Sequence, residues 1–225
     1  MEQVRDFSDR RISSRCCFCG DVGSTGDHVP SKAFLDEPFP ENLMIVRCCK
    51  ECNHSFSADE EYAACVIEVA RCGSLDVERE KVKRMLAHNP SGRGEIWAAA
   101  DAIRTNVSPV VRNGRIENVV NKVAKGLATF MAGMWVSNIE SRVFVLSKLS
   151  NSDKDAFEAL RPYELWPEAG SRLLQQVVVL NNSEILPLWD VCQEGRFRYL
   201  IVQKYDWCEV RMVFSEYLAV IARCA

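Results

Sequence analysis

The spacing of apolar and polar residues predicts two short strands and a helix at the start of the chain. A first extended segment is expected to end at His28 and Val29, because Pro30 cannot donate to a strand ladder. Residues 43 to 46 form a second apolar run, and prolines keep the stretch between the two runs in a loop. A helix follows, since apolar residues then recur at helical spacing: Phe56, Tyr62, Cys65, Val66, Val69 and Ala70.

The pattern changes from helical to extended towards the end of the chain. Helices are predicted over 75–89, 95–105, 116–136 and 152–161. β-branched and aromatic runs then predict strands over 175–180, 196–204, 208–216 and 217–222. We therefore expect an α+β fold with two domains. Residues 1–72 form the first and residues 73–225 the second, which is helical over 73–162 and carries a small mixed or antiparallel sheet over 173–225.

Composition supports a globular protein with its own hydrophobic core. The chain has 225 residues, of which 48% are hydrophobic and 26% charged. The longest apolar stretch, 119–136, contains Lys122 and Lys125, so it predicts a buried helix rather than a membrane span. The first residues lack the apolar core of a signal peptide. We therefore expect a cytoplasmic protein without a membrane segment.

The charge is unevenly distributed along the chain. Residues 1–60 carry seven Lys and Arg against eleven Asp and Glu, which is a poor balance for binding nucleic acid. Residues 79–125 carry ten basic residues against four acidic ones. This run is either an ordinary solvated surface or a nucleic-acid contact, and the candidate contact residues are Arg79, Lys81, Lys83, Arg84 and Arg93.

Six of the eleven cysteines fall in two clusters, at 15–20 and 47–52. Each cluster holds one C-x-x-C pair: Cys16 with Cys19, and Cys49 with Cys52. Clustered cysteines in a reducing compartment bind metal more often than they form disulfides. Four thiolates suit tetrahedral zinc and leave no open coordination position. A structural zinc site is expected, although buried apolar cysteines are the alternative.

Together these motifs resemble the HNH endonuclease family, whose ββα-metal fold often has a four-cysteine zinc frame. The likeness rests on C-F-C-G, D-H-V-P, E-N-L and C-K-E-C-N, in that order, and the longer string over 27–62 is similar to a group of bacterial HNH-like proteins. K-V-A-K-G-L at 122–127 extends the likeness weakly to about residue 135. The resemblance implies that His28, Asn42 and Asn53 are the three signature residues.

Phosphodiester hydrolysis needs an activated water and a cation that stabilises charge on the phosphate. A neutral histidine is a suitable base near neutral pH, so His28 is expected to take the proton. Asp27 and Asn53 supply the oxygen ligands that Mg²⁺ or another divalent ion such as Mn²⁺ or Ni²⁺ would need, and His54 competes with Asn53. The resemblance gives Asn42 the task of orienting His28, while a turn asparagine is equally compatible with the sequence.

Two neighbouring residues complicate this expected site. Adjacent strand residues point to opposite faces, so a bulge or an irregular strand end is needed to bring Asp27 and His28 together. Glu60 lies on the same helical face as Asn53, but an acidic first turn also stabilises a helix N-terminus. Glu60 is therefore left out of the predicted catalytic set.

The sequence thus predicts a metal-dependent HNH endonuclease that cuts nucleic acid, most simply DNA. Its acidic charge suggests a protein partner that delivers or activates, an oligomer is compatible with the chain, and a bacterial restriction or antiphage defence system is a natural setting for such a nuclease. The alternative is a non-catalytic zinc module that binds nucleic acid or protein. In that case Asp27 and His28 only shape the loop.

Overall fold

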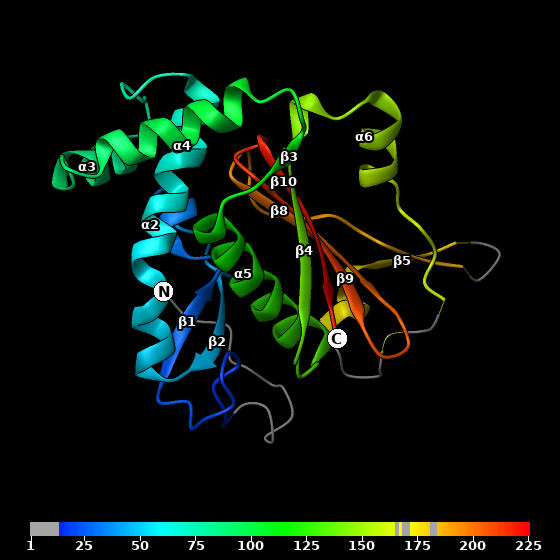
Figure 1. Ribbon diagram of the computed structural model, residues 1–225. Coiled ribbons are helices and arrows are strands. Elements are labelled where there is room, and N and C mark those ends of the chain that lie inside the picture. The colour runs from blue at the N-terminus through cyan, green and yellow to red at the C-terminus, as the bar shows by residue number, and fades with distance from the viewer. Residues whose placement is uncertain (1–13, 165–166, 168–171, 181–183) are drawn as a thin grey trace.

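A computed structural model describes residues 14–164, 167, 172–180 and 184–225. It begins with a small hairpin and a long helix, and it ends in a six-stranded antiparallel sheet, with one central helix between the two (Figure 1). The α+β class predicted from the sequence is confirmed. None of the described helices combines the length and the apolar character that crossing a bilayer requires.

The hairpin pairs β1 (Thr25–Val29) with β2 (Met44–Cys48), as the two apolar runs predicted. Its register is regular, with Asp27 opposite Val46 and His28 opposite Ile45. Asp27 is buried and His28 only half-buried, in keeping with the alternation of faces along a strand. The expected bulge is absent from this described hairpin, so the two side chains leave opposite faces.

Helix α2 (Lys50–Cys72) begins at the second cysteine pair, as predicted. The sulfur of its N-cap residue, Cys49, accepts a hydrogen bond from the backbone N–H of Cys52. The helix ends where Gly73 adopts φ of 68°, a left-handed conformation that glycine adopts without strain. A short 3₁₀ turn, η1 (Lys32–Phe34), follows the hairpin's first strand.

The middle of the chain forms helices α3 (Glu80–His88), α4 (Arg93–Thr105) and α5 (Gly114–Ala132), close to their predicted ranges. Helix α5 ends four residues earlier than predicted, because Gly133 takes a left-handed φ of 67°. The short helix α6 (Asn151–Glu158) follows a 3₁₀ turn, η2 (Leu146–Lys148).

Six strands form the main sheet in the order β3-β4-β10-β9-β8-β7, all antiparallel. The strands are β3 (Val110–Val111), β4 (Ile139–Val145), β7 (Asp190–Gln193), β8 (Phe197–Gln203), β9 (Cys208–Phe214) and β10 (Leu218–Cys224). Strands β8, β9 and β10 match the strands that the sequence predicts over 196–204, 208–216 and 217–222. Strands β3 and β4 lie inside the stretch 73–162 that the sequence predicts to be helical, so this stretch is only partly helical.

A smaller ribbon pairs β5 (Val177–Val179) with β6 (Ile185–Pro187). The predicted strand over 175–180 begins later than expected, because its first residues belong to the 3₁₀ helix η3 (Arg172–Gln176). The sequence N-N-S at 181–183, which predicts a turn after this strand, lies outside the described residues.

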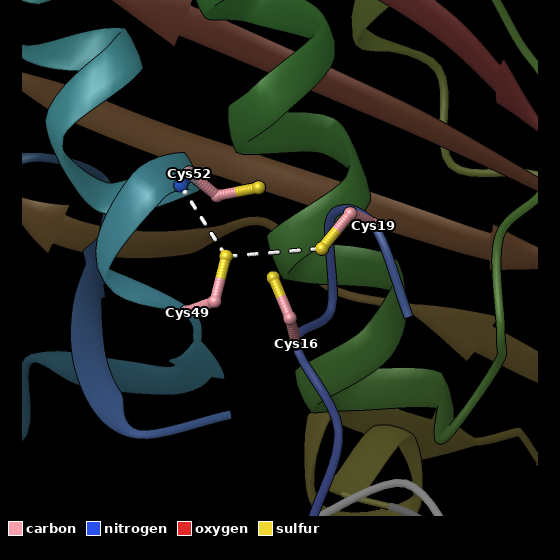
Figure 2. A group of neighbouring side chains, drawn as sticks. All are labelled: Cys16, Cys19, Cys49 and Cys52. Atoms are coloured by element: carbon pink, nitrogen blue, oxygen red, sulfur yellow. Dashed lines mark hydrogen bonds between the residues drawn. The ribbon is translucent and has the colours of Figure 1, made fainter. Parts of the chain in front are cut away.

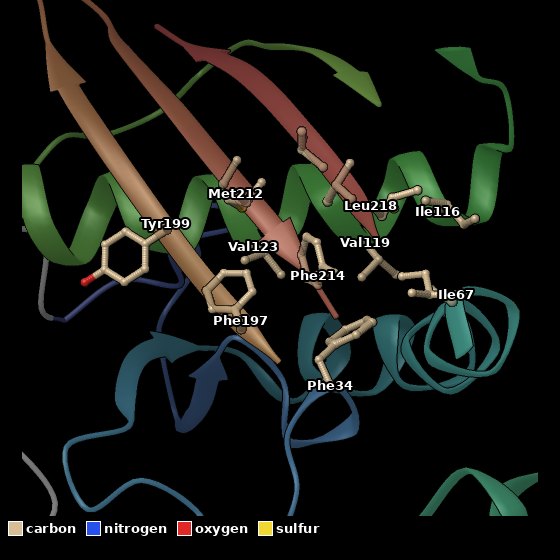
Figure 3. Packing of buried hydrophobic residues seen from close by; sticks show 14 of the residues in the cluster. Phe34, Ile67, Ile116, Val119, Val123, Phe197, Tyr199, Met212, Phe214 and Leu218 are labelled. Atoms are coloured by element: carbon tan, nitrogen blue, oxygen red, sulfur yellow. The ribbon is translucent and has the colours of Figure 1, made fainter. Parts of the chain in front are cut away.

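Helix α5 joins the hairpin to the sheet. Figure 3 shows Ile116, Val119 and Val123 of α5 facing Met212 and Phe214 of the sheet, with Phe34 and Ile67 beside them. One buried apolar cluster therefore includes residues from both sides of position 72. The opposite face of the sheet is covered by α6, where Phe157 packs against Val213 and Ala219. The division into two domains at residue 72 stays a prediction.

Candidate functional site

The four cysteines of the two C-x-x-C pairs come together in space. Cys16 and Cys19 lie in the loop before β1, while Cys49 and Cys52 start α2, and their sulfur atoms all lie within 4.8 Å of one another (Figure 2). The Sγ atoms of Cys19 and Cys49 are 3.8 Å apart. A zinc tetrahedron with bonds of about 2.3 Å has edges of about 3.8 Å. The sulfurs therefore fit a structural zinc ion.

The surroundings shift the pKa values of these thiols in different directions, although metal binding requires the thiolate form. Burial and the other three sulfurs raise the pKa of Cys52. The backbone of Asp21 lowers the pKa of Cys19, but burial with the sulfurs of Cys16 and Cys49 outweighs it and raises the pKa to about 11. Burial raises the pKa of Cys16, but backbone N–H groups of Cys19, Cys49 and Phe18 outweigh it and lower the pKa to about 7. The neighbouring Cys17 is buried in the apolar core, and Cys48 instead contacts the hydroxyl of Thr25 at 3.1 Å. Neither belongs to the four-cysteine group.

Helix α5 supports the first cysteine loop. The ammonium of Lys125 donates to the carbonyl of Phe18 at 3.0 Å and lies 5.4 Å from the ring centre of Trp135. Gly20 directly follows Cys19 and has φ of 86°. The ring of Trp135 packs against the place where a Cβ at position 20 would be. A residue with a Cβ would therefore be strained and crowded at position 20.

Asp27 points into the protein, towards α2 and α5. Its carboxylate lies 2.6 Å from the ammonium of Lys122, which also contacts the carboxylate of Glu60. The hydroxyl of Ser31 donates to the second oxygen of Glu60 at 2.9 Å. The exposed fractions of the Asp27, Lys122 and Glu60 side chains are 8%, 2% and 10%. We call Asp27, Lys122, Glu60 and Ser31 the lysine cluster.

Burial and charge act in opposite directions within the lysine cluster. Burial lowers the pKa of Lys122, but the carboxylates of Asp27 and Glu60 outweigh it, so the pKa is raised. Burial raises the pKa of Glu60 more than Lys122 and Ser31 lower it. The Lys122 side chain is therefore protonated and positively charged at neutral pH.

His28 lies on the outer face of the hairpin, where it remains half-buried. Burial lowers its pKa, the charges of Lys32 and Lys122 lower it further, and Asp27 opposes them. The imidazole is consequently neutral at neutral pH. It can accept a proton, which is the property that the sequence assigned to it.

Asn53 and His54 face different surroundings, although they are neighbours in α2. The Asn53 amide donates to the hydroxyl of Thr25 at 3.4 Å, and Thr25 lies on the same face of β1 as Asp27. His54 is exposed, and its Nδ1 lies 2.8 Å from the Lys50 carbonyl one turn earlier in the same helix. Asn53 thus contacts β1, whereas the contact of His54 lies within its own helix, and the choice between them as a metal ligand stays a prediction.

Asn42 lies in the loop before β2 and is exposed. It borders a cavity of about 200 Å³ that the hairpin shares with the ends of α5 and β8. Met44 and Tyr199 also line this cavity, and the Tyr199 hydroxyl donates to Asp190 at 3.0 Å. No hydrogen bond joins Asn42 to His28 in the described part of the chain, so the orienting role of Asn42 stays a prediction.

The predicted catalytic ion does not fit the side chains as they stand. In the described parts of the chain, the four cysteines are the only group of three or more Cys, His, Asp or Glu residues that could hold a metal ion. The carboxylate of Asp27, its expected ligand, is held by Lys122. The sequence analysis weighed Glu60 and left it out as part of an acidic helix start, and it placed Lys122 in a basic run, so neither was predicted to contact Asp27.

The candidate nucleic-acid contacts are in mixed positions. Arg79 is buried and its guanidinium pairs with Asp36 at 2.5 Å. Lys81 binds the backbone carbonyl of Lys32, and Lys83 pairs with Glu80 on its own helix at 3.0 Å. Arg84 and Arg93 are exposed. These last two are the freest to meet a phosphate backbone.

Comparison with protein-family models, with curated proteins and with solved structures finds no match for this chain. The resemblance to HNH nucleases therefore stays an expectation from the sequence motifs.

Proposed function

We propose that the protein is a zinc-framed nuclease of the HNH type that hydrolyses phosphodiester bonds of nucleic acid, most simply DNA. One observation carries the proposal: a hairpin and a following helix are joined by four converging cysteines, with Asp27 and His28 at the end of the first strand. Strand, loop, strand and helix follow one another in the order that the motifs imply.

His28 carries the chemistry in this proposal. Its neutral imidazole takes a proton from the attacking water, and its position on the outer face of the hairpin leaves it open to a substrate. Lys32 is the cation that most strongly lowers the pKa of His28, and an ammonium beside the base would also attract a phosphate. The exposed Arg84 and Arg93 supply further contacts to the backbone. The proposal includes a protein partner that delivers DNA, as in a restriction or antiphage defence system.

A plasmid-nicking assay with Mg²⁺, Mn²⁺ or Ni²⁺ tests the proposal. His28→Ala should lower the cleavage rate by a factor of about 10² to 10⁴, the usual contribution of a general base. His88→Ala is the matched control, because His88 is exposed and its ring nitrogen contacts only the Arg84 carbonyl of its own helix. Equal rates for the wild type and His28→Ala, in every metal, contradict the proposal.

The second candidate is a zinc module without catalysis that binds nucleic acid or protein. The engagement of Asp27 by Lys122 favours this candidate, since it removes an expected metal ligand. Binding of labelled DNA or RNA that survives His28→Ala, with no cleavage by either protein, would support it.

A further inference from the structure

Three separate parts of the chain bring charged groups into one buried place. Asp27 comes from β1, Glu60 from α2 and Lys122 from α5, and each side chain is nine-tenths buried or close to it. We propose that Lys122 is a built-in cation that closes this site to divalent metal, so that a metal ion reaches Asp27 only when the Lys122 ammonium leaves. The inference rests on the proposed function in that Asp27 is the expected metal ligand there.

The position of Lys122 is fixed by a close approach between α5 and β1. Gly126 lies one helical turn after Lys122, and a Cβ at this position would be 2.7 Å from Cγ2 of Val29. Lys122 and Gly126 share one face of the helix, just as Asp27 and Val29 share one face of the strand. The glycine contact therefore sets the lysine directly against the carboxylate.

Aromatic rings surround the ammonium on its remaining sides. Its nitrogen lies 5.1 Å from the ring centre of Phe56 and 5.7 Å from that of Phe18. Such rings attract a cation through their faces and exclude water. The ammonium thus lies against both carboxylates and near both rings, so a second cation at this place would meet its charge while Lys122 is there.

The groups around Lys122 are also those that a hard divalent ion prefers. Asp27 and Glu60 offer carboxylate oxygens, and Ser31 offers a hydroxyl that already binds Glu60. Two carboxylates and one ammonium leave a net charge of −1 when all are ionised. Replacing the ammonium by a divalent ion would neutralise the site, which favours the exchange once the lysine can move away.

Binding of Mn²⁺ to the zinc-loaded full chain tests the inference, followed by electron paramagnetic resonance. Lys122→Met removes the ammonium and should bind one Mn²⁺ at least about tenfold more tightly than the wild type, a modest effect for removing a competing charge. Adding Asp27→Asn should abolish that gain. Lys125→Met is the matched control, because this lysine of the same helix contacts Phe18 and Trp135 instead. Equal affinity in the wild type and Lys122→Met, or a gain that survives Asp27→Asn, overturns the inference.

A second measurement needs no variant, in case Lys122→Met fails to fold. Amine-specific acetylation of the wild type, mapped by peptide mass spectrometry, reports whether Lys122 is covered. Lys122 should be protected without Mn²⁺ and should become reactive as Mn²⁺ is raised, while Lys125 should not change. Reactivity that is independent of Mn²⁺ contradicts the inference.

Failure of the inference is distinguishable from failure of the nuclease proposal. If Lys122→Met gains Mn²⁺ binding but no protein cleaves DNA in a His28-dependent way, the inference about Lys122 holds and the nuclease proposal fails. If the wild type cleaves through His28 while Lys122→Met gains no Mn²⁺ binding, the nuclease proposal holds and the inference about Lys122 fails.

Discussion

Two groups of side chains that can carry negative charge lie beside the same hairpin, and their surroundings differ. The four cysteine sulfurs converge as a metal site and fit a zinc ion taken from solution. The carboxylates of Asp27 and Glu60 already have a cation, which the chain itself supplies through Lys122. The comparison shows that one group of these side chains is placed as a metal ion would need it, whereas the other is already paired with a lysine of the chain itself.

Removing zinc ligands should have the largest effect. Cys16→Ser with Cys49→Ser should abolish tight zinc binding and unfold the hairpin and the start of α2, because a structural zinc contributes on the order of 10 kcal/mol in small domains. Zinc content by mass spectrometry and the thermal midpoint measure both consequences. Cys72→Ser, at an exposed cysteine outside the group, should retain the zinc. If the double variant keeps its zinc, the four cysteine sulfurs are not the zinc site.

Removing the internal cation should have the next largest effect. Lys122→Met should lower the free energy of unfolding by about 3–5 kcal/mol, since it leaves two buried carboxylates without a counter-charge. Combining it with Asp27→Asn and Glu60→Gln should recover part of the loss. Urea unfolding of the zinc-loaded proteins measures the difference, and an unchanged stability in Lys122→Met would show that the ammonium does not neutralise the site.

The close approach of α5 is a smaller contribution. Gly126→Ala should cost about 1–3 kcal/mol, because the added methyl group overlaps Val29 and moves Lys122 away from Asp27. Gly94→Ala is the control, since nothing lies within 4 Å of a Cβ there. That change should stabilise α4 by roughly 0.5–1 kcal/mol. Thermal unfolding that ranks the two variants in the opposite order would contradict the packing described for α5.

The pH dependence of cleavage gives the smallest and most specific effect. Because the pKa of His28 is lowered, cleavage should be lost with falling pH at a midpoint below the ordinary value of 6.5. Lys32→Gln removes a charge that lowers this pKa, so it should move the midpoint towards higher pH. The exposed Lys83, paired with Glu80, serves as the control when changed to Gln. If Lys32→Gln leaves the pH midpoint of cleavage unchanged, His28 is not the base that titrates.

The sequence predicts the parts of this molecule that depend on short spacing. Cysteines three residues apart, a proline after Val29 and helical periodicity after Cys52 are local signals, and the hairpin, α2 and the sulfur cluster follow from them. Strand β4 was missed because its first four residues, Ile139–Arg142, contain a single apolar side chain, and only the last three form an apolar run. Local periodicity alone did not separate it from its neighbours.

The lysine cluster could not be predicted in the same way, because its members are far apart along the chain. Lys122 is 62 residues from Glu60 and still further from Asp27. Its role depends on how closely α5 packs on β1, and that packing depends on a single glycine. Charge counting placed Lys122 in a basic run, whereas its side chain is buried and paired.

The central position of α5 sets a limit on how this module can be transplanted. A fragment that stops at residue 72 would carry all four zinc ligands to a new host protein, but it would leave Asp27 and Glu60 without their cation and Val29 without the helix that packs on it. The portable unit therefore extends at least through Ala132, the last residue of α5. The face of α5 that packs on the sheet, which includes Val119 and Val123, would then need a new apolar partner in the host protein.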